Sequence, residues 1–186
     1  MALDNVSVIE VVLQGAKGAS GASLLTRIGR FTSQADQSPT GLGDAGIITV
    51  SAGAGGDTAN GELTVDPDGT ITANVAGNYS ITLVAQFGRS NSIGESVMLG
   101  RVVKSTDGGT TYNQQDSTFL VKIGGNNVLW RETFTTLFEL NVGDKIKYEM
   151  ARDPSGADDG SIMQQQPTGD LNTWNPTDTV LLDIYV

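Results

Sequence analysis

The chain has 186 residues and carries 21 acidic against 11 basic side chains, a net charge of −10, with no histidine and no cysteine. The missing residue types exclude Ser–His and Cys–His nucleophile systems, ordinary zinc sites and disulfide bonds, so we expect no enzyme and no cofactor. The absence of a basic cluster argues against nucleic-acid binding, and no apolar stretch is long enough to insert into a membrane.

The first patterned segment is residues 4–14, whose β-branched and partly alternating side chains predict one strand. A single strand is unstable in water, so this one needs a partner outside the segment. We expect it to anchor the protein on a larger particle by adding a strand to a partner's sheet. The candidate anchor residues are its apolar side chains: Val6, Val8, Ile9, Val11, Val12 and Leu13.

Glycine recurs at every third position in the next nine residues, at Gly15, Gly18 and Gly21. This spacing lets three chains approach one axis, as in a triple helix, and it also suits a flexible linker. A linker around a threefold axis satisfies both interpretations, and the sequence leaves them open. We therefore expect an anchor strand and linker over residues 1–23 and a head over residues 24–186.

From residue 24 onwards short apolar runs alternate with glycine-rich turns, and no window has helical periodicity. The clearest hairpin surrounds Asp66-Pro67-Asp68-Gly69, where proline presets the first turn dihedral and glycine accepts the positive one. Strands are predicted at 24–32, 47–50, 62–65, 70–75, 77–87, 97–104, 119–123, 128–140, 145–150, near 162, and at 179–186. About ten short strands separated by loops indicate an all-β sandwich or barrel.

Alternation within these strands predicts which side chains are buried. Leu25, Ile28 and Phe31 are candidate core residues of the first strand, and Trp130 is a candidate core residue of the long strand at 128–140. The residues of 77–87 that share one face are Tyr79, Ile81, Leu83, Ala85 and Phe87. The aromatic residues that fit either the core or contacts on a threefold axis are Tyr79, Phe87, Phe119, Phe134 and Phe138.

Three segments resemble motifs of C1q/TNF-like jelly rolls. Residues 69–81 (GTITANVAGNYSI) resemble the signature G-x-F-T-x-P-x-x-G-x-Y-x-F, and residues 140–146 resemble the L-x-x-G-D-x-V turn. Between them, residues 97–104 followed by Asp107-Gly108-Gly109 are similar to the V-x-L-x-x-N-G strand and loop. Order and spacing agree over residues 24–186. The resemblance implies a ten-strand jelly roll that assembles as a homotrimer.

The layout of a strand, a Gly-x-y tract and a β head also resembles small virion proteins of tailed bacteriophages. This resemblance implies a capsid decoration (cement) or head-fibre protein on the outer surface of the virion, docked through its arm to a major capsid or tail protein. The alternative is a tail-associated receptor-binding protein that recognises a host surface glycan. The short chain without a long shaft favours the first.

Carboxylates are the remaining candidates for catalysis and metal binding. A pair drawn from Glu95, Glu132, Glu139 and Glu149 could hydrolyse a glycosidic bond, but alternation turns the last three towards solvent. Hard oxygen ligands suit calcium, and the candidate ligands are Asp153, Asp158 and Asp159 in one loop, with Asp66 and Asp68 as a second cluster. Aspartate beside proline and glycine also forms Asx turns, so we favour turn chemistry and predict no metal.

The region 151–176 is predicted to be mostly loop, rich in glutamine, asparagine and threonine, and it contains Trp174. Binding sites often combine an aromatic surface with a few polar groups, which makes Trp174, Gln164 and Gln165 the candidate glycan contacts. The other interpretation, which we favour, is that Trp174 anchors the loop by packing back on the sandwich.

Overall fold

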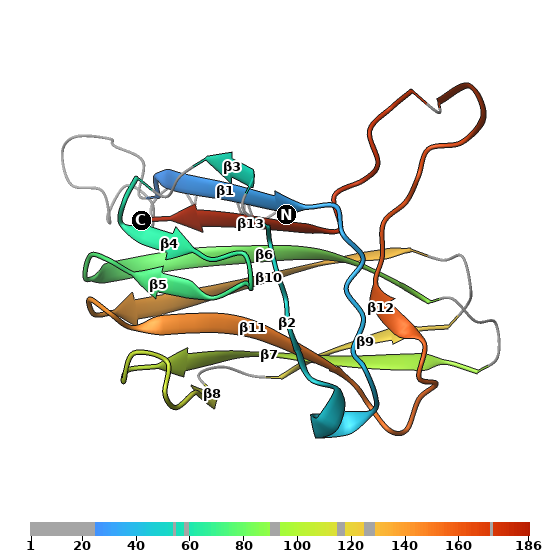
Figure 1. Cartoon of the computed structure of the whole chain (residues 1–186), viewed down its shortest axis with the longest axis horizontal. Coiled ribbons are helices and arrows are strands. Elements are labelled where there is room, and N and C mark those ends of the chain that lie inside the picture. Colours follow the sequence, from blue (N-terminus) through green and yellow to red (C-terminus); the bar gives the residue numbers. More distant parts are fainter. Residues whose placement is uncertain are drawn as a thin grey trace, which may run out of the picture.

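Strands account for almost all of the regular structure, and they form two sheets packed face to face (Figure 1). The computed structural model describes residues 25–186 except 54, 58–59, 90–93, 115–117, 125–128 and 172. The predicted arm, with its anchor residues and linker glycines, lies outside the described residues. No helix in the described part of the chain is long and apolar enough to cross a membrane.

Sheet A contains β1 (Arg27–Ser33), β3 (Gly55–Asp57), β6 (Gly77–Arg89), β10 (Trp130–Leu140) and β13 (Val180–Tyr185) in the order β10-β6-β13-β1-β3. A short strand, β12 (Gly160–Ile162), also pairs with β6. All pairs are antiparallel, and β13 lies between β6 and β1 at the centre of the sheet.

Sheet B contains β4 (Leu63–Val65), β5 (Ile71–Ala73), β11 (Lys145–Arg152) and β7 (Ser96–Ser105) in that order. The far edge of β7 pairs with β8 (Asn113–Gln114) and β9 (Phe119–Ile123), and β2 (Ile48–Thr49) pairs with β11. Two single-turn 3-10 helices, η2 (Gly43–Gly46) and η3 (Gly169–Leu171), lie in the loops.

The strand order identifies the fold. Sheet A has the central order β1-β13-β6-β10 and sheet B has β5-β11-β7-β9, so the chain crosses repeatedly between the sheets. This arrangement is the pair of Greek keys of an eight-strand jelly roll. β3 and β4 extend the two sheets and bring the number to the predicted ten, and β2, β8 and β12 are additional short strands. The predicted all-β jelly roll is confirmed.

The core lies between the sheets and consists of apolar side chains that are almost fully buried. Sheet A contributes the alternating residues predicted for β6, and sheet B contributes Met98, Val102, Ile146, Tyr148 and Met150. Full burial of a large apolar side chain contributes about 1.5–3 kcal/mol. The buried Tyr148 hydroxyl donates to the Ile81 carbonyl at 3.2 Å, so its polar end is satisfied.

Two phenylalanines close the sandwich along one side. Phe119 of β9 and Phe134 of β10 stack with ring centroids 3.6 Å apart, which joins an edge strand of sheet B to the edge strand of sheet A. Both rings are partly buried against the core, whereas Tyr79, Phe87 and Phe138 are buried within it. Of the five aromatic residues that the sequence assigned to either the core or a threefold axis, three therefore lie in the core and two pack against its edge.

Three predicted side-chain positions are wrong. Leu25 is 52% exposed because it precedes β1, and Trp130 is 53% exposed because it begins β10 at the rim of the sandwich, where its indole donates to the Glu132 carboxylate. Glu149 is buried rather than solvent-facing because Arg101 and Lys147 neutralise it. The sequence also missed β3 and β8, which lie in glycine-rich or polar segments without an apolar pattern.

Candidate functional site

The most prominent surface feature is the loop of residues 163–178, which joins β12 to β13 and projects beyond the sheets (Figure 1). Two hydrogen bonds link the sides of its stem: the Thr177 N–H donates to the Gln165 carbonyl at 3.0 Å, and the Gln165 N–H donates to the Thr177 hydroxyl at 3.0 Å. The projection is therefore a braced structure with a defined tip.

Gln164 and Gln165 belong to the stem and not to the tip. The Gln164 N–H donates to the Asp36 carboxylate at 2.6 Å, and its side-chain amide donates to the Gln34 carbonyl at 2.7 Å. Gln165 makes the cross-stem bonds to Thr177. The structure therefore uses both predicted contact residues to hold the loop in place.

The tip displays two large apolar side chains to solvent. Trp174 is 65% exposed and Leu171, the last residue of η3, is 45% exposed. The Trp174 N–H donates to the Leu171 carbonyl at 2.9 Å, which connects the two residues through the backbone. With 65% of its surface exposed, Trp174 does not pack back on the sandwich as the favoured interpretation expected.

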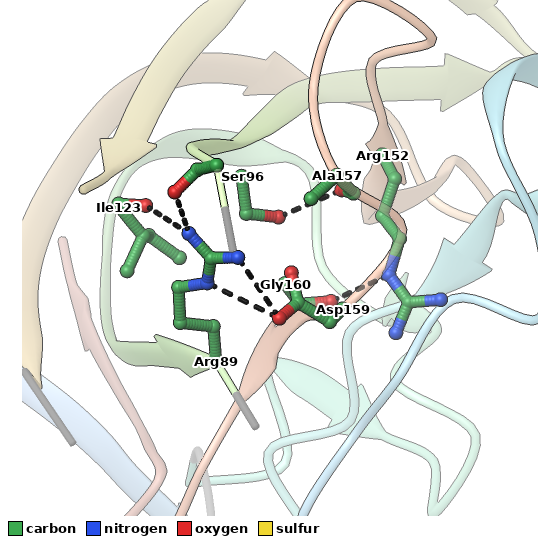
Figure 2. A network of polar contacts seen from close by, with 8 residues as sticks. Arg89, Ser96, Ile123, Arg152, Ala157, Asp159 and Gly160 are labelled. Carbon is green, nitrogen blue, oxygen red and sulfur yellow. Dashed lines mark hydrogen bonds and ion pairs between the residues drawn. The ribbon is translucent and has the colours of Figure 1, made fainter. Parts of the chain in front are cut away.

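A buried ion pair fixes the base of this loop (Figure 2). Arg89, at the end of β6, has a fully buried side chain whose Nε and Nη2 both lie 3.1 Å from Oδ2 of Asp159, which immediately precedes β12. Arg89 also donates to the carbonyls of Gly94 and Ile123. One guanidinium thus joins β6, β9 and the two loops that flank β7 and β12.

Two further bonds in the same network hold the segment that leads into β12 (Figure 2). The Ser96 hydroxyl donates to the Ala157 carbonyl at 3.0 Å, and the Arg152 Nε donates to the Gly160 carbonyl at 2.7 Å. A buried charge is stable only when it is paired and hydrogen-bonded. The network pairs the Arg89 and Asp159 charges within the protein and connects the loop base to β6, β7 and β9.

The three aspartates considered as calcium ligands do not converge. Asp153 accepts hydrogen bonds from the hydroxyl and N–H of Ser155, which lower its pKa, and Asp159 pairs with Arg89. In the hairpin turn, Asp68 accepts the Thr70 N–H at 2.9 Å. No group of three or more acidic side chains that could hold a metal occurs among the described residues. Turn chemistry explains Asp153 and Asp68, and a buried ion pair explains Asp159.

The carboxylates considered for hydrolysis are likewise engaged separately. Glu95 lies 3.4 Å from the Lys122 ammonium, Glu132 accepts the Trp130 indole N–H, and Glu149 forms ion pairs with Arg101 and Lys147. Glu139 is exposed on β10. Among the described contacts, no side-chain partner is shared by two of these carboxylates.

A second surface that the sequence analysis missed is the outer face of sheet A. Register places Thr133, Thr135 and Leu137 of β10 opposite Val84, Thr82 and Ser80 of β6, and these in turn opposite Leu181, Asp183 and Tyr185 of β13. We call these nine residues the sheet A face. Leu137 is 79% exposed, and a hollow of about 280 Å³ lies between it and Leu25.

The sheet A face contains one charged side chain, and charged residues flank it: Arg131 and Glu139 on the same side of β10, and Arg30 on β1. Its single acidic residue, Asp183, is neutralised by Arg30, whose Nε and Nη2 donate to the two carboxylate oxygens at 2.7 and 2.8 Å. The hydroxyls of Thr82 and Thr135 bond to each other at 2.9 Å. The alternation of Thr133, Thr135 and Leu137 was the sequence signal for the uncharged middle of this face, which lies between Arg131 and Glu139 on β10.

Comparison with known proteins adds a likeness of fold. No protein-family model matches the sequence, and no curated protein matches it. Among solved structures, the chain is similar to the Eiger TNF of S. frugiperda, with 11% sequence identity and a TM-score of 0.49 over 86% of this chain and 92% of that chain. The jelly-roll assignment itself rests on the strand order of the two sheets.

Proposed function

We propose that this chain is a homotrimeric structural protein on the outer surface of a tailed-bacteriophage virion, a capsid decoration or head-fibre protein. The jelly-roll head faces outward, and the arm of residues 1–23 docks on a major capsid or tail protein. The observation that supports the proposal is the sheet A face, a strip of nine residues whose one charged side chain, Asp183, is paired with Arg30 and whose Leu137 is 79% exposed. Surfaces of this kind mark protein–protein contacts.

Two more observations support an assembled structural role. The chain has no histidine or cysteine, and its candidate catalytic carboxylates are occupied by separate ion pairs and hydrogen bonds. A partner that binds only the folded, assembled form stabilises that form by its binding free energy. Three copies on one axis also bind a multivalent particle with higher avidity than a single copy, without any new kind of contact.

Sedimentation equilibrium of the full-length protein tests the assembly. We expect a single species of three times the 19.4 kDa chain mass, because burial of the sheet A face against a neighbouring copy favours association. A single-copy species would overturn the proposal, since the arm would then be covering its own head.

Electron microscopy of phage particles labelled with an antibody against the head tests the location. We expect label on the outer surface, and loss of incorporation when Ile9→Asp and Val11→Asp are combined in the full chain. A trimer that still forms but no longer reaches the particle would confirm the anchor. Unchanged incorporation of this variant would refute the anchor residues.

A second candidate function is a tail-associated receptor-binding protein that recognises a host surface glycan. The specific observation in its favour is the tip of the 163–178 loop, where an indole is held in solvent on a braced stem. Adsorption of phage carrying Trp174→Ala separates the two candidates. Unchanged adsorption supports the decoration role, and a loss of adsorption supports receptor binding.

A further inference from the structure

We infer that the tip of the 163–178 loop is a contact site for neutral carbohydrate, with the Trp174 indole as the stacking surface. The inference rests on the second candidate function and defines its ligand class. The starting point is the exposure of a large apolar side chain: the Trp174 indole gains little burial energy and lies at the tip of a loop whose stem is closed by hydrogen bonds between Gln165 and Thr177.

The charge of the loop favours a neutral ligand over an anionic one. Residues 163–178 contain two aspartates and neither lysine nor arginine. Arg131 reaches only the stem, where it donates to the Asp178 carbonyl at 2.9 Å. Asp170 lies in η3 beside the exposed Leu171. An anionic ligand such as a sialylated glycan, a nucleic acid or an acidic phospholipid surface would meet like charge at this tip.

The exposed apolar area at the tip favours a small ligand over a protein partner. A stable protein–protein contact buries about 800 Å² on each partner, whereas one aromatic side chain supplies about 150–250 Å². Trp174 and Leu171 alone fall well short of the first figure. One face of an indole does match one sugar ring, because the positive C–H groups of the sugar meet the negative face of the aromatic ring.

Polar groups near the indole complete the chemistry. Thr173 and Asn175 flank Trp174 and are exposed, and they offer a hydroxyl and an amide that both donate and accept hydrogen bonds. The Asp170 carboxylate is an acceptor for sugar hydroxyls. Gln164 is a positioning residue in this scheme, because its amide is already bonded to the Gln34 carbonyl.

The test applies full-length protein to an array that carries neutral and sialylated oligosaccharides, together with phosphatidylcholine vesicles. We expect binding to neutral glycans, a loss of about tenfold or more in affinity for Trp174→Ala, and retention of most affinity for Trp174→Phe. Trp130→Ala is the matched control, because Trp130 is also exposed but lies on the rim at β10, and its affinity should not change.

Several results would overturn the inference. These are no glycan binding by a correctly folded protein, binding only to sialylated glycans, Trp174-dependent binding to the vesicles, or equal affinity of wild type and Trp174→Ala. Sedimentation of each variant shows whether it retains the assembly of the wild type. A trimer that binds no glycan removes this inference and leaves the structural role intact, whereas a monomer that binds neutral glycan does the reverse.

Discussion

The outer faces of the two sheets differ in what they expose to solvent. On sheet B, Glu149 is bonded by Arg101 at 2.8 Å and by Lys147 at 2.9 Å, and the Lys147 ammonium also lies 4.3 Å from the centre of the Tyr112 ring. On sheet A, Leu137 and the threonines of β10 face outward without cover from the described residues. The buried carboxylate on sheet B is thus covered and paired, whereas Leu137 on sheet A is 79% exposed.

A loop of sheet B also pairs its charge internally. Between β7 and β8, Asp107 accepts hydrogen bonds from the Ser105 hydroxyl and from the Thr111 and Thr110 N–H groups, which lower its pKa to about 2. The folded loop therefore has its own internal partners. Asp183 on sheet A is also paired internally, with Arg30, so the feature that suits the sheet A face to another protein surface is its exposed Leu137.

The largest effect is expected from placing a charge on each face in turn. Leu137→Arg should turn the proposed trimer into single copies, because an arginine buried at its interface without a partner would oppose association by several kcal/mol. Leu120→Arg, which alters a 54%-exposed residue on β9 of sheet B, should leave the trimer intact. Analytical ultracentrifugation of both variants checks this, and equal behaviour would break the distinction between the faces.

The next largest effect concerns the buried ion pair at the base of the projecting loop. Asp159→Ala should lower the free energy of unfolding by roughly 3–5 kcal/mol, because it leaves the Arg89 charge buried without its main partner. Chemical denaturation of each variant measures this loss.

The control for the ion pair is Glu95→Ala, which removes a pair with Lys122 whose side chains are both about half exposed. This substitution should cost less than about 1 kcal/mol. If both variants lost the same stability, the Arg89 network would not be the element that fixes the loop base.

Regular strands could be predicted from the sequence because their signal is local. The alternation of Tyr79, Ile81 and Leu83 gave both the existence of β6 and its buried face, and the Asp-Pro-Asp-Gly turn gave the β4–β5 hairpin. The same local rule failed at the ends of strands. Trp130 lies on the core-facing side of β10, but it is at the rim of the sandwich and therefore exposed. Its position relative to the rim depends on how the two sheets overlap, which the alternation of residues does not reveal.

The candidate sites depended on longer-range information. Trp174 was identified from its polar surroundings, but its exposure follows from the stem bonds between Gln165 and Thr177. The sheet A face joins β6, β10 and β13, which are far apart in the chain. Arg89 and Asp159 are 70 residues apart, and neither has a neighbour in the sequence that suggests a buried ion pair.

A moderate effect is expected where the two sheets meet at Phe119. A Cβ on Gly100 would lie 1.9 Å from the Phe119 ring, and the ring is stacked on Phe134. Gly100→Ala should therefore cost about 1–3 kcal/mol through overpacking. Gly124→Ala is the control, because no described atom lies within 4 Å of its Cβ position, and its cost should stay within about 0.5 kcal/mol. The denaturation midpoints of the two variants, compared at an unchanged m-value, measure the difference in stability.

The smallest effect concerns the corner between β10 and β11, where Asp144 closes the turn. Burial raises the pKa of Asp144, but the Lys104 ammonium at 2.8 Å and the Asn141 N–H at 2.9 Å bring it below its ordinary value. Asp144 therefore contributes stability above the unfolded-state pKa of about 3.9, and this contribution is lost as the pH falls through the lower folded-state pKa.

Asp144→Asn should lower stability at neutral pH and make its decline in acid less steep, because the titrating group is gone. Urea denaturation at a series of pH values from neutral to acidic measures both effects, with the exposed Asp170→Asn as the control. If the unfolding free energy of Asp144→Asn fell as steeply with decreasing pH as that of the wild type, other carboxylates would be responsible for the acid sensitivity. Because Lys104 also donates to the Glu139 carbonyl at the end of β10, a loss at this corner would loosen the edge strand that carries Leu137.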